Sequence, residues 1–92
     1  MVEVEFDFNC IKTIIQCNIN EKMIDIFNKY IVKIGKDRNE IYFIYDGNKI
    51  EENKKDIKFN ELANKDDKER KKMNILVNEI SINKEEKNRK EL

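Results

Sequence analysis

The chain has 92 residues, which is enough for one domain and too few for two. It contains no histidine, so catalytic triads and histidine-containing zinc sites are excluded, and its two cysteines cannot form a four-thiolate zinc site. Lysines and arginines number 19, as do aspartates and glutamates, whereas a nucleic-acid binder held by bulk electrostatics needs a basic excess. Composition therefore favours a small binding or structural domain without a cofactor over an enzyme.

We expect neither a secretory leader nor a membrane span. The first nine residues alternate acidic and apolar side chains, whereas a leader runs from basic to apolar. The sequence contains no apolar stretch of the 18 or so residues that a bilayer requires. With only Cys10 and Cys17, the chain fits a reducing compartment, the cytoplasm or nucleus, with both thiols free. A disulfide across a hairpin is the alternative.

Two strands are expected at the start of the chain. Residues 2–8 alternate apolar and acidic side chains, which is the period-two pattern of a half-buried strand. A turn at residues 9–12 precedes a second alternating segment at residues 13–18. Because the connection is so short, the two strands are expected to pair as an antiparallel hairpin.

A helix is expected over residues 20–34. Its apolar side chains recur at helical intervals, and they are Met23, Ile26, Phe27, Tyr30, Ile31 and Ile34. Asn18 or Asn20 is the expected N-cap. Gly35 is the expected end, because glycine adopts the left-handed cap conformation without a Cβ clash.

A third strand and a short returning strand are expected after the helix. Residues 40–45 are dense in β-branched and aromatic side chains, which favours a strand. Asp46 followed by Gly47 is a turn signal, and residues 49–51 can pair back on the third strand.

The remainder of the chain is mostly charged. Ile57, Phe59 and Leu62 are isolated apolar anchors under a loop. Residues 63–72 hold a single small apolar residue and are expected to be a solvated loop, with a lysine contact to an acidic partner as the minor alternative. The last strand is expected at residues 73–77, and residues 81–92 are expected to be a polar, flexible tail.

The resulting order is β-β-α-β-β-loop-β, which predicts an α+β fold. Each strand pair has one apolar face, and one helix covers it, so we expect a mixed sheet of four to five strands with a single covering helix. The expected core consists of Val4, Phe6, Ile15, Cys17, Met23, Ile26, Tyr30, Phe43, Ile50, Leu62, Met73 and Ile75.

In this order and spacing the sequence resembles the ubiquitin family, which has the β-grasp fold. Residues 43–50, Phe-Ile-Tyr-Asp-Gly-Asn-Lys-Ile, are similar to ubiquitin's Leu-Ile-Phe-Ala-Gly-Lys-Gln-Leu and to the Phe-x-Phe-Asp-Gly-x-x-Ile of SUMO-type proteins. Residues 73–77, Met-Asn-Ile-Leu-Val, are similar to ubiquitin's final strand, Leu-His-Leu-Val-Leu. The resemblance covers residues 2–77 and implies a ubiquitin-like domain over residues 1–80.

The sequence departs from the conjugated members of that family in its tail. Those members end in Gly-Gly, because bare backbone must approach the adenylate closely in a narrow channel of the activating enzyme. This sequence has no glycine after Gly47. The resemblance therefore implies a non-conjugated, non-catalytic interaction module. Its expected partners are proteins, either ubiquitin-pathway receptors or a larger assembly, and neither nucleic acid nor a membrane span is expected.

The resemblance also implies a protein-binding patch. Alternation directs Tyr42 and Ile44 outward from the third strand and Leu76 outward from the last strand. Phe8 occupies the place of the third apolar residue of ubiquitin's patch, and Lys49 and Tyr42 are the expected rim contacts. Compositional drift in an isoleucine-rich chain is the alternative explanation for such exposed side chains.

Two other apolar sets give alternative surfaces. Ile14, Ile31 and Lys33 would line a groove for an extended peptide beside the second strand, as in SUMO-like proteins. Ile24 and Val32, again with Ile31, would form an outer helix face through which a structural subunit docks permanently in a larger complex. A wide buried stripe on the helix explains the same three residues.

Overall fold

The computed structural model describes residues 1–51 and 54–80, so the expected tail at residues 81–92 lies outside the described residues. Its first element is the predicted hairpin. β1 (Val2–Phe8) pairs antiparallel with β2 (Ile11–Cys17). The connection consists of Asn9 and Cys10, and both have positive φ angles, 53° and 66°, as a type I′ turn requires. The turn is therefore shorter than expected, and β2 begins two residues earlier.

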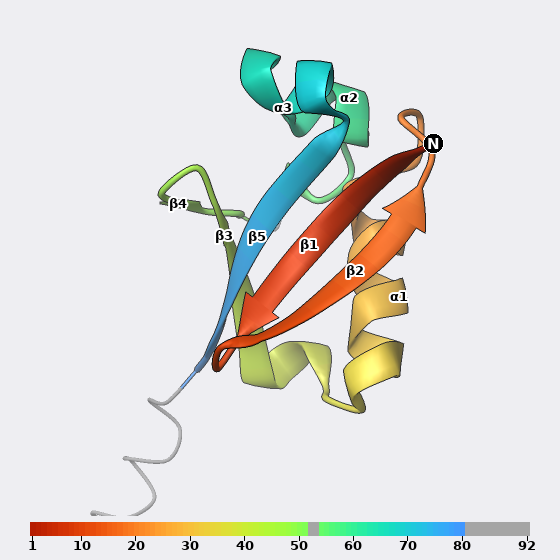
Figure 1. The fold of residues 1–92 in the computed structure, drawn as a ribbon. Helices are drawn as coiled ribbons and strands as arrows, with labels where there is room; N and C mark the ends of the chain where they lie inside the picture. The colour runs from red at the N-terminus through yellow and green to blue at the C-terminus, as the bar shows by residue number, and fades with distance from the viewer. Residues whose placement is uncertain (52–53, 81–92) are drawn as a thin grey trace, which may run out of the picture.

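A mixed five-stranded sheet is built around this hairpin (Figure 1). β5 (Lys72–Glu79) lies parallel to β1, and β3 (Ile41–Tyr45) lies antiparallel to β5. The two-residue strand β4 (Asn48–Lys49) pairs with β3 at one edge, so that the order is β2-β1-β5-β3-β4. The predicted α+β class and mixed sheet are confirmed.

Helix α1 (Met23–Ile34) packs across one face of the sheet, as Figure 1 shows. Its N-cap is Lys22, without a side-chain cap, so the expectation of an asparagine cap is wrong. The reason is that backbone takes the place of a cap: the Met23 N–H donates to the Ile57 carbonyl and the Ile24 N–H to the Lys55 carbonyl, both at 2.8 Å. Gly35 ends the helix as expected, with φ 73°.

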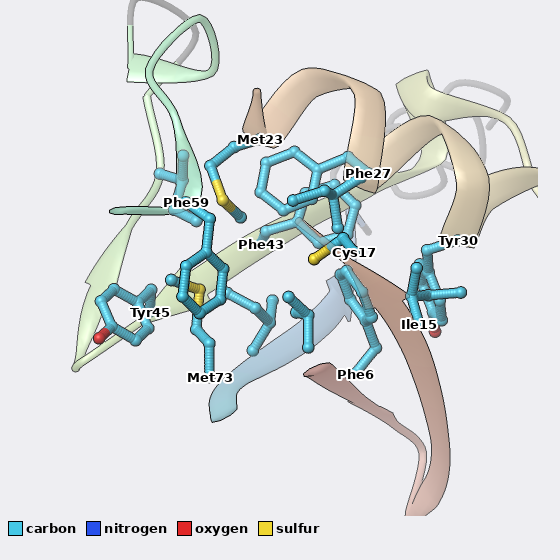
Figure 2. Close-up of a cluster of buried hydrophobic side chains, with 14 of the residues drawn as sticks. Phe6, Ile15, Cys17, Met23, Phe27, Tyr30, Phe43, Tyr45, Phe59 and Met73 are labelled. Carbon is cyan, nitrogen blue, oxygen red and sulfur yellow. The ribbon is translucent and has the colours of Figure 1, made fainter. Parts of the chain in front are cut away.

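The core lies between α1 and the sheet and is organised by aromatic rings (Figure 2). Phe6 stacks on Tyr30 and Phe27 stacks on Phe43, each pair with centroids 4.1 Å apart. All the predicted core residues are buried except Leu62, which is half-buried against the core. Sequence reasoning left out several buried residues, namely Val2, Phe27, Ile31, Ile41, Tyr45, Phe59, Ala63 and Val77.

Short helices connect the larger elements. A 3-10 turn, η1 (Arg38–Glu40), leads into β3, and α2 (Phe59–Leu62) seats Phe59 in the core. Among the residues that the structure describes, no helix combines the length and apolar composition needed to cross a bilayer.

The expectation of a solvated loop over residues 63–72 is wrong, because this segment contains helix α3 (Lys65–Arg70). Asn64 caps the helix by accepting a hydrogen bond from the Asp67 N–H at 2.9 Å. Asp67 turns inward and is only 5% exposed. Its carboxylate accepts a 2.6 Å hydrogen bond from the Tyr45 hydroxyl and pairs with the Arg70 guanidinium. These partners satisfy the charge, which is what allows a carboxylate to be buried here.

The two cysteines lie at opposite ends of β2, and both thiols are free. Cys10 is exposed in the turn, whereas Cys17 is buried at the far end of a seven-residue strand. Such a strand is roughly 20 Å long, and disulfides need Cα atoms within about 7 Å, so the hairpin disulfide is excluded. Burial raises the pKa of the Cys17 thiol to about 11, so this side chain behaves as a small apolar group.

The buried hydroxyl of Tyr45 gives a first prediction. Tyr45→Phe leaves the Asp67 Oδ2 without its hydrogen-bond donor and the Asn64 N–H without its acceptor, while the Arg70 pair on Oδ1 remains. The free energy of unfolding should fall by about 1–3 kcal/mol in urea titrations at neutral pH. Tyr42→Phe is the matched control, because the Tyr42 hydroxyl makes no hydrogen bond to any described residue, and it should change stability by less than about 0.5 kcal/mol.

The same pair of variants has a defined pH dependence. Burial, and then the hydrogen bond to Asp67, raises the pKa of Tyr45 from 10 to about 12. A group with a raised folded pKa stabilises the fold fully below its unfolded pKa and loses that contribution as the pH approaches the folded value. The penalty of Tyr45→Phe should therefore be constant from neutral pH to pH 10 and shrink between pH 10 and pH 12. A penalty that does not change over this interval contradicts the assignment.

Candidate protein-binding surface

The face of the sheet opposite α1 carries the outward-pointing side chains of all five strands. Ile44 on β3 lies directly opposite Leu76 on β5, and Lys49 on β4 lies opposite Ile44. On the other side, Leu76 is in register with Asp7 of β1. Leu76 is 46% exposed, and Ile44 is half-buried. The alternation of β3 and β5 thus places two predicted site residues directly opposite each other on neighbouring strands.

Tyr42 and Lys49 lie beside this apolar pair. Both point to the outer face, and the Lys49 Nζ lies 5.1 Å from the centroid of the Tyr42 ring. A cation over an aromatic face is attracted by the ring's quadrupole, which fixes the long lysine side chain against the tyrosine. The structure therefore brings together Tyr42, Ile44, Lys49 and Leu76, and these four residues are called the outer patch below.

Phe8 does not belong to the outer patch, which corrects its assignment. β1 continues in the same phase to its last residue, so Phe8 points to the helix side together with Val4 and Phe6. There it packs against the core, and its ring centroid lies 5.7 Å from the Lys36 Nζ. It also lines a 300 Å³ cavity with Tyr30 and other residues. The resemblance to ubiquitin predicted an outward-pointing Phe8 from its position in the sequence. The alternation of β1 instead directs this side chain toward α1.

The two alternative surfaces are not formed. Ile31 is buried in the core, so it lines neither a peptide groove nor an outer helix face. Ile14 sits opposite Glu5 on the outer face of the sheet, on the side away from α1. Ile24 is half-buried, which leaves Val32, 81% exposed, as an isolated apolar residue on the helix. A wide buried stripe accounts for the helix sequence.

Acidic residues border the outer patch, and the sequence did not predict a place for them in the site. A depression of about 320 Å³ lies over Ile44 and Leu76, with Asp7 and Asp46 at its border. A second depression, of about 620 Å³, adjoins it and shares Asp46 and Asn74. The signal for Asp7 was present in the sequence, since the alternation that buries Phe6 also turns Asp7 outward.

This surface consists of apolar and charged side chains. In residues 1–51 and 54–80, no group of three or more histidine, cysteine, aspartate or glutamate side chains is placed to hold a metal ion. The outer patch combines exposed apolar area with charged side chains beside it.

Comparison with known proteins supports the fold. No protein-family model and no curated protein matches the sequence. A chain in the crystal structure of ATBAG1 in complex with HSP70 superposes with a TM-score of 0.66 at 10% identity, over 95% of this chain and 45% of that chain. This chain thus spans less than half of that neighbour's length.

The ubiquitin-like domain of the Arabidopsis thaliana protein At2g32350 is also similar. Its solution NMR structure gives a TM-score of 0.69 at 16% identity, over 89% of this chain and 80% of that one. A second structure of At2g32350 also gives a TM-score of 0.69, at 15% identity and 88% coverage of both chains. The expected ubiquitin-like β-grasp fold is therefore confirmed.

The opposite placements of Phe8 and Leu76 give the second prediction. Phe8→Ala removes a ring that packs on the core, so the free energy of unfolding should fall by about 1–3 kcal/mol. Leu76→Ala removes a half-exposed side chain and should change it by about 0.5 kcal/mol or less. Urea unfolding followed by circular dichroism measures both. Equal effects of the two substitutions would contradict the assignment of Phe8 to the core side.

Proposed function

We propose that this chain is a ubiquitin-like protein-interaction module that binds its partners through the outer patch. The observation that carries the proposal is the direct cross-strand pairing of Ile44 with Leu76 on the face of the sheet that α1 leaves uncovered. Removing apolar side chains at the centre of such a face from water stabilises the complex with a partner. Tyr42 adds an aromatic anchor, a residue type that is enriched in binding hot spots.

The module acts without catalysis and without being conjugated. The chain has no histidine, and the buried Cys17 thiol, with its raised pKa, is a poor nucleophile. After Leu76 the strand β5 continues to Glu79, and no glycine follows Gly47 in the sequence. A flexible Gly-Gly segment next to the sheet, as an activating enzyme requires, is therefore not available in these residues.

Protein partners fit both the fold and the surface. A structural neighbour with this fold was solved in complex with HSP70, which supports an interaction role for domains of this shape. Ubiquitin-pathway receptors or the components of a larger assembly are the partners that we propose. The exposed free thiol of Cys10 favours a reducing compartment, the cytoplasm or nucleus.

The outer patch is tested by partner recovery with matched variants. The partner is first captured with the unmodified chain and purified. Ile44→Ala and Leu76→Ala should each weaken its binding free energy by about 1–2 kcal/mol, measured by titration calorimetry. Ile14→Ala is the control, because Ile14 has the same 46% exposure as Leu76 and lies on the same face, two strands away. Binding that survives both patch substitutions, in variants that remain folded, overturns the proposed site.

Conjugation is tested separately. Incubation of the chain with ATP and purified activating enzymes for ubiquitin or its relatives should give no thioester on a non-reducing gel, because no glycine follows Gly47 in this sequence. Ubiquitin in the same reactions is the positive control. A thioester-linked band that disappears on reduction would show that the chain is a modifier.

A further inference from the structure

We propose that the partner segment bound by the outer patch is cationic, with an apolar anchor flanked by lysine or arginine. The inference rests on the proposed function and adds the charge of its partner. It follows from the carboxylates that border the patch and from the ion pairs that these carboxylates do not make.

The first observation is where the acidic side chains lie. Asp7 is half-buried and in direct register with Leu76, so any segment that covers Leu76 also approaches this carboxylate. Asp46, in the turn after β3, borders both depressions. Asp66 and Glu69 of α3 border the second one. The apolar pair thus has acidic groups on the β1 side and around the turn.

The cations near the outer patch already form ion pairs within the chain. The two depressions are lined by two cations, Lys12 and Arg70. Lys12 is the direct cross-strand neighbour of Asp7, but its Nζ lies 3.8 Å from a Glu5 carboxylate oxygen, and Glu5 also pairs with Lys72 at 3.0 Å. Arg70 forms its ion pair with Asp67, and Asp66 adds to the negative field around the same guanidinium.

Four other carboxylates line the same two depressions. In residues 1–51 and 54–80, the side chains of Asp7, Asp46, Asp66 and Glu69 form no ion pair. Although the chain as a whole has zero formal charge, this surface has an excess of available negative charge. Lys49 is a positive charge within the outer patch. It lies on the other side of Ile44 from Leu76, with its Nζ over the Tyr42 ring.

These charges select the partner. Covering Leu76 with an apolar anchor also removes water from around Asp7. Desolvation of a carboxylate is unfavourable unless a cation replaces the water. A lysine or arginine next to the anchor supplies that cation, whereas a glutamate in its place is repelled. A negatively charged segment is also repelled by these carboxylates as it approaches, which slows its association. Because salt screens this repulsion, the preference for a cationic segment should weaken as ionic strength rises.

The experiment uses the full chain and two synthetic peptides of equal length with the same leucine and isoleucine anchors. One peptide has lysine flanks, and the other has glutamate flanks. We expect the lysine peptide to shift the backbone amide signals of Asp7, Ile44, Asp46 and Leu76 in nuclear magnetic resonance titrations. It should bind about tenfold more tightly than the glutamate peptide at about 50 mM salt, and the difference should shrink at about 500 mM.

Variants identify the groups responsible. Asp7→Asn combined with Asp46→Asn should weaken the lysine peptide about three- to tenfold and leave the glutamate peptide unchanged or tighter. Asp25→Asn is the matched control, because Asp25 is an exposed carboxylate on α1, on the opposite side of the sheet. It should leave both affinities unchanged.

The outcomes separate the two proposals. If both peptides bind the patch equally and Ile44→Ala weakens both, the cationic preference is overturned and the proposed function stands. If the lysine peptide shifts only amides away from the outer patch, or shifts none at about 1 mM, the surface itself is wrong and both proposals fail.

Discussion

The parallel pairing of β1 with β5 is the contact on which the rest of this fold depends. It joins the two ends of the domain at the centre of the sheet, with Val4 beside Met73 and Phe6 beside Ile75. All four side chains are fully or almost fully buried in the core. Because the side-chain period of a strand is two, this register also fixes what the opposite face displays. The neighbour relation between Asp7 and Leu76 is a direct consequence of the packing on the other side.

Sequence patterns were sufficient wherever a side chain's direction follows from local alternation. The strands β1, β3 and β5, the helix α1 and its end at Gly35 all follow from periodicity and from one conformational rule. The outward direction of Ile44 and Leu76 follows in the same way, and their contact required only the strand order of the β-grasp fold. Phe8 was misplaced because a position taken from a related sequence was preferred to the phase of its own strand.

Features that depend on distant segments were not accessible from the sequence. α3 is six residues long and has no apolar stripe, and its inward residue is an aspartate. Nothing in the local pattern distinguishes Asp67 from its charged neighbours, because its burial depends on Tyr45, 22 residues earlier in the chain. The start of α1 is similar, since the backbone of residues 55 and 57 satisfies the N–H groups that an asparagine was expected to cap.

The central position of β5 also has a consequence for the order in which the native fold is completed. The hairpin and α1 form from the first 35 residues, but the inner edge of β1 lacks its strand partner until residues 72–79 are available. Contacts between such distant segments incur a large loop-closure entropy and make folding slow. The native sheet is therefore completed only when the last strand docks beside β1, and any compact state that precedes this step exposes the inner edge of β1.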